Sequence, residues 1–399
     1  AQHSKGSVES ERMRVLFLNE SFLYYTGLLA KALAEAGHDI VFIAPYRAGD
    51  FRFHKSDDPQ GEFKQFLGDK VRLEWVDIPA DTNLRTIRAN LSVIRRMTNL
   101  IRRFKPDVIH VHDMADYRYL LTVAICRKRF PIVMTVHNAE PHLGKKDNRM
   151  EFLRPYLRRM SDRYIVHGQT IKEHLLRVSN IPAEKVDCVS MIAYDFHRLW
   201  MTGRQDDGRT VLFFGGVFRY KGIEYLIKAA PSIRSRIPDA RIVIAGSGPD
   251  WPRCRSFIED PGAFELIDRA LTNPEVTQLF EEASVVVLPY TEASQSAVLG
   301  LAYAMGKPVV ATTVGSLPEG VQKGVTGLLV PPADSDALAQ AIITLLENDD
   351  LRRQMGQKAL EKATIGDFSP SKIAMRTQEV YKCAIEGRNR TTNAKGVFA

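Results

Sequence analysis

The residues best suited to bind an anion form one short segment in the second half of the chain. A continuous apolar run ends at Phe214 and leads into Gly215 and Gly216, and two cations, Arg219 and Lys221, follow shortly after. Glycine lets the backbone approach a ligand closely, and arginine and lysine clamp the oxygens of a diphosphate. The segment therefore indicates a diphosphate site, although a basic turn between a strand and a helix has the same composition.

A second segment places small polar side chains where a helix is expected to begin. Ser294, Gln295 and Ser296 precede an apolar helical pattern that starts at Ala297. The first turn of a helix carries unpaired N–H groups and the positive end of the helix dipole, and it therefore attracts phosphate. We expect a second phosphate contact here, with an ordinary serine cap as the alternative.

The elements that must position these segments are short apolar runs alternating with helical patterns. In the first half, we expect strands at Arg14–Asn19, Asp39–Ala44, Val108–His112, Ile132–His137 and Tyr164–Val166. We expect helices around Leu28–Ala36 and at Leu84–Phe104. Such alternation with short links predicts a parallel sheet covered by helices on both faces.

The alternation restarts after a polar stretch at Met201–Gly208, which we interpret as a linker. The expected strands are Arg209–Phe214, Arg241–Ala245, Phe264–Ile267, Val285–Leu288, Val309–Ala311 and Gly327–Val330. The expected helices are Ile223–Ile233, Pro274–Glu282, Ala297–Met305, Asp334–Glu347, Leu351–Ala363 and Lys372–Ile385. From Arg388 on, we expect a loose tail.

This order predicts two α/β domains, each with a doubly wound parallel sheet. We assign residues 13–200 to the first domain and residues 208–371 to the second, and we expect a last helix at 372–388 to cross back to the first. A length of 399 residues suits two domains of ordinary size. Because ligands of such folds bind at the carboxyl ends of the strands, the expected site is the cleft between the domains.

Several segments carry a resemblance to a known family. In the second half they are VLFFGGVFRYKGIEYLIKAA, ARIVIAGSGP and PYTEASQSAVLGLAYAMGKPVVATTVGSLPEGVQKGVTGLLVPPAD; weaker ones in the first half are AEAGHDIVFIAP, KPDVIHVHD and PIVMTVHNAEPH. They resemble the retaining GT-B glycosyltransferases that include glycogen and sucrose synthases. The resemblance implies two Rossmann-like domains facing a central cleft, a nucleoside-diphosphate sugar as donor, and no metal or other cofactor.

The resemblance also implies roles for individual residues on the donor side. Lys221 matches a lysine that contacts the donor diphosphate. Gly216 stands where the family usually has a partner arginine, so Arg219 is our hypothesis for that role. Gly246 and Gly248 match the glycines of a loop near the nucleotide. The other predicted donor-binding residues are Gly215, Gly216, Arg269, Ser294, Gln295 and Ser296.

On the first domain, the motif TVHN brings His137 to the place of a histidine that the family sets beside the donor sugar. A buried histidine bonded to the backbone is the alternative. The usual Gly-Gly turn after the first strand is replaced by Asn19–Thr26, and we expect Tyr25, Thr26 and Asp113 on the acceptor side.

The chain departs from the family at a pair of glutamates that are normally eight positions apart. Ala293 and Leu301 stand at these places, and the loop reads ASQS. Leu301 cannot hydrogen-bond, so the partner of the ribose is left open. Glu292 lies one place away and is our hypothesis for the contact to the sugar. With His137, Lys221 and Arg219 it completes the predicted catalytic set.

The resemblance implies a retaining hexosyltransferase that works by front-face substitution, and no residue pair in the sequence indicates the nucleophile of a double displacement. The acceptor is expected to be a lipid-linked or anionic glycan of exopolysaccharide or envelope synthesis, with a soluble metabolite as the alternative. The base of the donor stays open, with UDP, GDP and ADP all considered. Two alternatives remain, a nucleotide-sugar epimerase on the same fold and a non-catalytic nucleotide-sugar-binding scaffold. A nicotinamide dehydrogenase is disfavoured because no G-x-G-x-x-G follows the first strand.

The excess positive charge lies in the first half of the chain. Residues up to Arg204 contain 33 Lys and Arg against 24 Asp and Glu, a net charge of +9, and the remainder carries −1. The expected helix at Leu84–Phe104 places Arg88, Arg95 and Arg102 on one face. Contact with an anionic membrane surface is one interpretation, and a solvated face is the other. No nucleic-acid module is recognised, so nucleic acid is not an expected partner.

The remaining features bear on location and metals. No apolar run reaches the length of a membrane span, and the four cysteines, at 126, 188, 254 and 383, stand far apart. We expect reduced, buried thiols in a cytoplasmic protein, with peripheral contact to the inner face of a membrane as an open question. The D-x-x-D sequence Asp113–Asp116 resembles a metal site only loosely, and we expect none.

Overall fold

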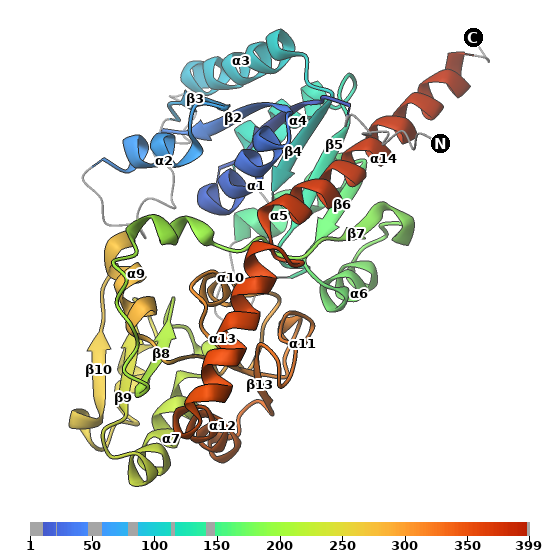
Figure 1. Ribbon diagram of the computed structural model, residues 1–399. Helices are drawn as coiled ribbons and strands as arrows, with labels where there is room; N and C mark the ends of the chain where they lie inside the picture. Colours follow the sequence, from blue (N-terminus) through green and yellow to red (C-terminus); the bar gives the residue numbers. More distant parts are fainter. Residues whose placement is uncertain are drawn as a thin grey trace, which may run out of the picture.

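The computed structural model describes residues 11–20, 22–46, 58–78, 87–112, 116–140 and 148–396. Within these ranges, two parallel sheets lie one above the other in the view of Figure 1. The first sheet has the order β3-β2-β1-β4-β5-β6-β7. Its strands are β1 (Arg14–Leu18), β2 (Asp39–Pro45), β3 (Val71–Val76), β4 (Val108–His112), β5 (Ile132–Val136), β6 (Arg163–Val166) and β7 (Val186–Cys188). This is the doubly wound order of a Rossmann-like domain.

The second sheet repeats this order as β10-β9-β8-β11-β12-β13. Its strands are β8 (Thr210–Phe214), β9 (Arg241–Ala245), β10 (Phe264–Ile267), β11 (Val285–Leu288), β12 (Val309–Thr312) and β13 (Gly327–Val330). The two central strands, β8 and β11, are runs of buried Val, Leu and Phe, because helices cover both of their faces.

Helices form the outer layers of the first domain. One side is covered by α1 (Leu23–Glu35), α2 (Pro59–Leu67) and α14 (Pro370–Gly396). The other side is covered by α3 (Ile87–Phe104), α4 (Tyr117–Cys126), α5 (Asn148–Met160) and α6 (Gln169–Val178). Each side has its own apolar core, so the sheet is buried on both faces.

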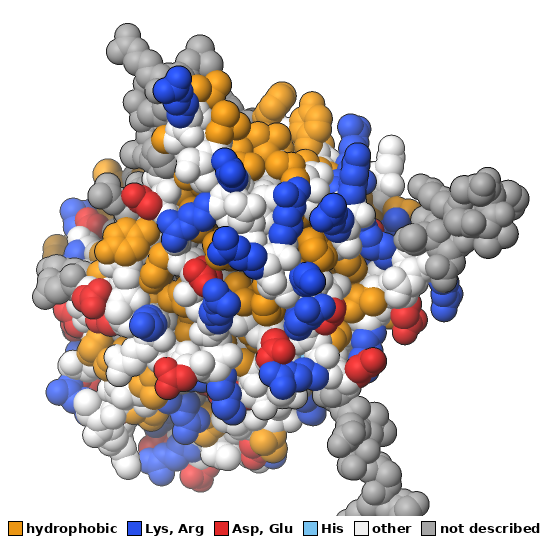
Figure 2. Space-filling model, turned by 90° about the horizontal axis from the view of Figure 1, so that it is seen from above, with side chains coloured by type: hydrophobic (Ala, Val, Ile, Leu, Met, Phe, Trp, Pro, Cys, Tyr) orange, Lys and Arg blue, Asp and Glu red, His pale blue; other side chains and the backbone are white. Residues whose placement is uncertain are grey.

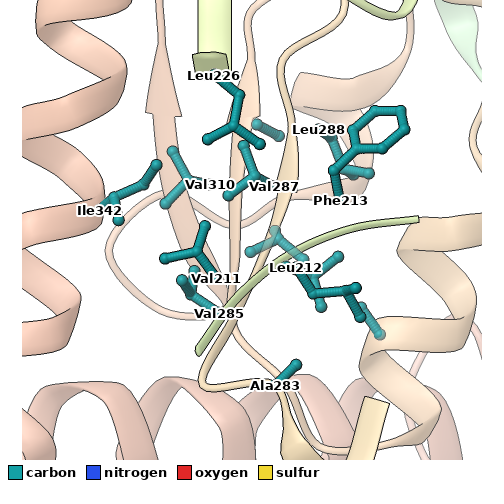
Figure 3. Close-up of a cluster of buried hydrophobic side chains, with 14 of the residues drawn as sticks. Val211, Leu212, Phe213, Leu226, Ala283, Val285, Val287, Leu288, Val310 and Ile342 are labelled. Atoms are coloured by element: carbon teal, nitrogen blue, oxygen red, sulfur yellow. The ribbon is translucent and has the colours of Figure 1, made fainter. Parts of the chain in front are cut away.

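The second domain has one continuous apolar core. Its helices are α7 (Ile223–Arg236), α8 (Trp251–Arg255), α9 (Asn273–Glu282), α10 (Ala297–Ala304), α11 (Leu317–Gly320), α12 (Ser335–Glu347) and α13 (Asp349–Thr364). Figure 3 shows Val211 of β8 and Val310 of β12 meeting Leu226 of α7 and Ile342 of α12. This packing holds the carboxyl ends of β8, β9 and β11 in fixed positions.

The last helix joins the two domains. In Figure 1, α14 leaves the end of α13 and runs along the first domain. Its residues Ile373 and Val380 belong to the core that α1 contributes to, and the hydroxyl of Tyr381 lies 2.5 Å from Nδ1 of His110. Arg388 donates to the backbone oxygen of Phe130 at 3.0 Å.

All eleven strands expected from the sequence are present, with ends that agree to within one residue. Two strands were not expected. β3 is an edge strand that is buried only at its two ends, with exposed or half-buried residues between them, and β7 has only three residues. Neither is a continuous apolar run, which was the pattern used to recognise buried strands.

Three expectations were wrong. α1 begins at Leu23 rather than near Leu28, because aromatic and aliphatic side chains from Leu23 on are buried in the core. α14 continues to Gly396, so a loose tail from Arg388 is not observed up to that residue; the ion pair of Arg388 with Asp162 anchors the helix there. All four cysteines are free, but Cys188 and Cys383 are exposed.

No helix in the part of the chain that the structure describes is long and apolar enough to cross a membrane.

Candidate functional site

A cavity of about 570 Å³ opens between the two domains at the carboxyl ends of β8 and β9. Most of its lining comes from the second domain, from the turns after these strands, the segment 269–271 and the start of α10. The first half of the chain adds a group of aromatic rings. The described lining residues are Tyr24, Tyr194, Phe196, His197, Phe214, Gly215, Gly216, Phe218, Gly246, Ser247, Gly248, Pro249, Arg269, Ala270, Leu271, Val276, Ala297, Val298 and Leu301.

Two glycine turns form one wall of this cavity, and their close packing requires glycine. A Cβ atom on Gly246 would lie 1.9 Å from the backbone oxygen of Gly215, and one on Gly248 would lie 2.1 Å from that of Val217. The turns are also joined by a hydrogen bond from the Val217 N–H to the backbone oxygen of Ser247, at 3.0 Å. The predicted glycines therefore shape the wall as well as lining the cavity.

The start of α10 faces the same cavity. Ser296 is the N-cap, as the sequence predicts, but its hydroxyl lies 3.1 Å from the Tyr290 hydroxyl and does not cap the helix. Ala297 and Val298, the first two helical residues, line the cavity. A helix start without a side-chain cap presents N–H groups and a positive dipole end, which suits an anion.

The two predicted cations lie in a single 3₁₀ turn, η5 (Arg219–Lys221), next to the cavity. Lys221 is half-buried, and its Nζ lies 3.7 Å from the centroid of the Tyr290 ring. Burial lowers the pKa of Lys221 to about 8. Arg219 is exposed. Neither side chain is among the described residues that line the cavity, so the structure brings Lys221 to the tyrosine and leaves Arg219 in solvent.

Polar side chains of the ASQS loop donate hydrogen bonds to the first domain. The Ser294 hydroxyl donates to the side-chain oxygen of Asn138, and the Gln295 amide donates to the backbone oxygen of His167. Glu292, at the start of this loop, is half-buried. The loop therefore joins the domains at the cleft, a role that the sequence analysis did not assign to these residues.

Four buried histidines, His110, His112, His137 and His167, cluster toward the carboxyl ends of β4, β5 and β6, and the backbone oxygen of His167 accepts the Gln295 contact. Nδ1 of His112 lies 2.8 Å from Nε2 of His137, and Nε2 of His112 lies 3.2 Å from the Thr26 hydroxyl. The Tyr25 hydroxyl lies 3.0 Å from Nε2 of His167. Tyr25 and Thr26, predicted on the acceptor side, thus lie on α1 and are buried in this histidine cluster.

The histidine cluster is held in the neutral form. Burial lowers the pKa of His110 to about 3 and that of His167 to about 4. Burial, and then the neighbouring histidines, lower the pKa of His112 and His137 well below the ordinary value. His137 is 8% exposed and its ring stacks on Phe22 at 4.2 Å, so it offers a hydrogen bond rather than a charge.

A further contact between the domains was missed from the sequence. The carboxylate of Glu319, in α11, accepts hydrogen bonds from Gln169 N at 2.6 Å and from Thr170 N at 2.9 Å. The Thr170 hydroxyl also donates to it, at 2.7 Å. These donors form the start of α6, whose N-cap Gly168 has no side chain to cap it. A side chain from the second domain therefore caps a helix of the first.

The two aspartates of the D-x-x-D sequence, Asp113 and Asp116, have different outcomes. Asp113 lies outside the described residues. Asp116, at the end of the D-x-x-D sequence, caps α4 by accepting from Arg118 N at 2.8 Å, and it also pairs with the Arg118 side chain. Within the described ranges, no group of three or more His, Cys, Asp or Glu side chains is arranged to hold a metal ion. Leu301, whose side chain cannot hydrogen-bond, lines the cavity.

Comparison with known families finds two matches. Residues 208–348 match the family described as "Glycosyl transferases group 1", and residues 24–190 match "Glycosyltransferase Family 4". An uncharacterized glycosyltransferase of Methanocaldococcus jannaschii is 31% identical over 313 residues, which cover 72% of this chain and 77% of that protein.

A characterised relative and a solved structure are similar over most of the chain. The phosphatidyl-myo-inositol mannosyltransferase of Mycolicibacterium smegmatis is 27% identical over 361 residues, covering 89% of this chain and 88% of the relative. Anabaena HepE in complex with UDP and glucose has a TM-score of 0.68 at 17% identity, covering 93% of this chain and 100% of HepE.

Proposed function

The chain belongs to the group 1 glycosyltransferases with the GT-B fold, and from this premise we propose that it transfers a hexose, with retention at the anomeric carbon, from a nucleoside-diphosphate sugar to a glycan or lipid-linked acceptor. We propose residues 13–200 with the helix 372–388 as the acceptor domain, and residues 208–371 as the donor domain. The acceptor belongs to envelope or exopolysaccharide synthesis, and the protein works in the cytoplasm at the inner face of a membrane.

The observation that carries the proposal is the cavity at the carboxyl ends of β8 and β9. It combines an apolar part, suited to a base, with two glycine turns and the uncapped start of α10, suited to phosphates. Among the similar proteins, HepE was solved in complex with UDP and glucose, and the mycobacterial relative is called a phosphatidyl-myo-inositol mannosyltransferase. These two proteins support a nucleotide donor and a lipid-linked acceptor.

The proposed chemistry is electrostatic. Departure of a nucleoside diphosphate builds negative charge on the leaving oxygen, and cations and N–H groups brought next to that oxygen stabilise the charge. We assign this role to Lys221, to the N–H groups at the start of α10 and to Arg219, whose exposed side chain turns inward when the donor binds. Lys221 then exchanges its contact with the Tyr290 ring for the diphosphate.

The histidine cluster positions the sugar. His137 is neutral and buried, so we assign it a hydrogen bond to a hydroxyl of the donor sugar, and no proton transfer. The Ser294 and Gln295 contacts to the first domain close the cleft and exclude water, which protects the activated donor from hydrolysis. Glu292 is our candidate for a second contact to the sugar.

The test replaces Lys221 by methionine, which keeps most of the apolar stem and removes the charge. We measure UDP or GDP release from UDP-glucose, UDP-N-acetylglucosamine and GDP-mannose in the presence of a bacterial lipid extract. The variant should lose at least 100-fold in rate, and Lys228→Met, which removes an exposed lysine of α7, should not. Near-normal rates in a folded Lys221→Met protein would refute the proposed clamp. Release of an epimerised sugar without acceptor would replace transfer by epimerisation.

A further inference from the structure

Three neighbouring helices of the first domain expose large apolar side chains in pairs. Each pair is four residues apart, so its members lie on one face of their helix. The pairs are Ile87 and Leu91 on α3, Leu121 and Ile125 on α4, and Phe152 and Tyr156 on α5. These six side chains, which we name the apolar surface, are between 45% and 67% exposed.

The apolar surface is not needed to hold the domain together. α3 contributes Val93, Met97 and Ile101 to the core, and α4 contributes Tyr119 and Val123 from its other side. The helices therefore pack on the sheet through different residues. Six large apolar side chains left in water on adjacent helices indicate a surface that binds something.

The helices that carry the apolar surface are rich in positive charge. Neither α3 nor α4 contains an Asp or Glu. In Figure 2, which looks down on the side where α3 lies in Figure 1, hydrophobic side chains gather in the upper part among Lys and Arg, and Asp and Glu lie mainly below. The exposed basic residues on these helices and the turn after α4 are Arg88, Arg95, Arg96, Arg102, Arg103, Arg127, Lys128, Arg129 and Arg159.

The apolar surface lies toward the cleft. In a doubly wound sheet, the helices run antiparallel to the strands, so they begin at the edge where the strands end. α4 begins at Tyr117, five residues after His112 ends β4 inside the histidine cluster. Ile87, Leu91, Leu121 and Phe152 all lie in the first two turns of their helices. A ligand held at this surface is therefore close to the proposed site.

We propose that α3, α4 and α5 dock this enzyme on a bilayer that contains anionic lipid, with the apolar surface inserted between the headgroups and the exposed arginines and lysines on the phosphates. Charge complementarity selects this occupant, because an acidic lipid surface matches the exposed cations that these helices carry beside aromatic and aliphatic side chains. Docking in this orientation presents the cleft to an acceptor held in the membrane. The orientation rests on the proposed function; the docking itself does not.

The test measures sedimentation of the full chain with vesicles of phosphatidylcholine alone and with 30% phosphatidylglycerol. We expect at least tenfold tighter binding to the anionic vesicles, weakened at high salt. Leu121→Ser combined with Phe152→Ser, and separately Arg95→Gln combined with Arg103→Gln, should each weaken binding at least fivefold. The control is Met375→Ser combined with Arg376→Gln, which alters exposed residues of α14 on the opposite face and should bind like the original protein.

Thermal unfolding checks that each variant is folded, and sedimentation velocity without vesicles checks for dimers. Absent binding to anionic vesicles, or binding unchanged in both variants, overturns the proposal. A dimer that Leu121→Ser with Phe152→Ser dissociates also overturns it and makes the surface an interface between copies. The vesicle assay contains no donor, so it measures docking separately from sugar transfer. A protein that binds anionic vesicles but transfers no sugar would refute the proposed function and leave this inference standing.

Discussion

Replacing Glu319 by glutamine removes the charge from the carboxylate that caps α6 across the domain boundary. The carboxylate accepts three hydrogen bonds, from Gln169 N and from the N–H and hydroxyl of Thr170. A hydrogen bond to a charged group contributes about 1.5–3 kcal/mol, and the charge at the helix start adds about 0.3–1 kcal/mol. Glutamine keeps one acceptor oxygen, and Glu319 is an exposed residue, so only part of these contributions is lost, about 1–2 kcal/mol.

That loss corresponds to roughly a 5- to 30-fold shift of the equilibrium from joined toward separated domains. Small-angle X-ray scattering should show a larger radius of gyration for Glu319→Gln, and UDP should bind more weakly, by at most the same factor. Glu361→Gln is the matched control, because Glu361 pairs with Lys358 inside α13 and touches no first-domain residue in that pair. An unchanged radius and unchanged UDP affinity in Glu319→Gln would show that this contact does not hold the domains together.

The same contact predicts a pH dependence. Burial raises the pKa of Glu319, but the hydrogen bonds from Thr170 and Gln169 outweigh it, and the pKa is lowered. A carboxylate with a lowered pKa contributes stability that is present above the pKa of the unfolded chain, near 4.5, and is lost as the pH falls through the folded value. The radius of gyration should therefore rise in acid for the original protein and depend less on pH in Glu319→Gln.

Three further predictions concern the cavity and the histidine cluster. Burial lowers the pKa of Lys221 to about 8, so between pH 8 and about 10.5 the unfolded chain binds more protons than the folded one. The free energy of unfolding should therefore rise over that range. Denaturant titrations of Lys221→Met should show a smaller rise. Gly246→Ala should lower the melting temperature and abolish UDP binding, because its Cβ would meet the Gly215 oxygen. Gly324→Ala is the control: its Cβ would have open space, so the protein should lose only the stability that its positive φ costs. Equal effects of the two substitutions would contradict the packing argument. The histidines of the cluster are neutral in the folded protein, and burial lowers the pKa of His167 to about 4. The free energy of unfolding should therefore fall as the pH drops from 6.5 to 4, by about 3 kcal/mol for His167 alone. A free energy of unfolding that does not change over this pH range would show that the cluster is not buried.

The fold could be predicted from the sequence because the central strands are continuous apolar runs. β8, β11 and β12 are buried on both faces. Their Val, Leu and Ala residues give a pattern that clearly predicts a buried strand. β3 was not predicted because Arg72 and Glu74 interrupt its apolar pattern, and β7 because it has only three residues. Helix ends were less predictable: Phe22, with a φ of 58°, starts α1 without a capping side chain, so the usual signal for a helix start is absent.

The candidate site was predictable only where its residues are close in the chain. The glycine turns and the start of α10 are local motifs, and the structure brings them to one cavity. The histidine cluster joins residues from three strands, and only the spacing of His110 and His112, two apart and so on one face of β4, hinted at it. Glu319 sits in a short helix that resembles any other turn, and its partners at 169 and 170 lie in the other domain.

The central claim is that the cavity between the domains binds a nucleoside diphosphate whose charge Lys221 neutralises. Titration calorimetry with UDP at pH 8, in two buffers of different ionisation enthalpy, tests it most directly. Burial lowers the pKa of Lys221 to about 8, so at pH 8 part of the Lys221 side chains are neutral before binding. The complex should therefore take up a fraction of a proton, and Lys221→Met should bind more weakly and take up none. UDP binding of equal strength and equal proton uptake in both proteins would contradict the claim.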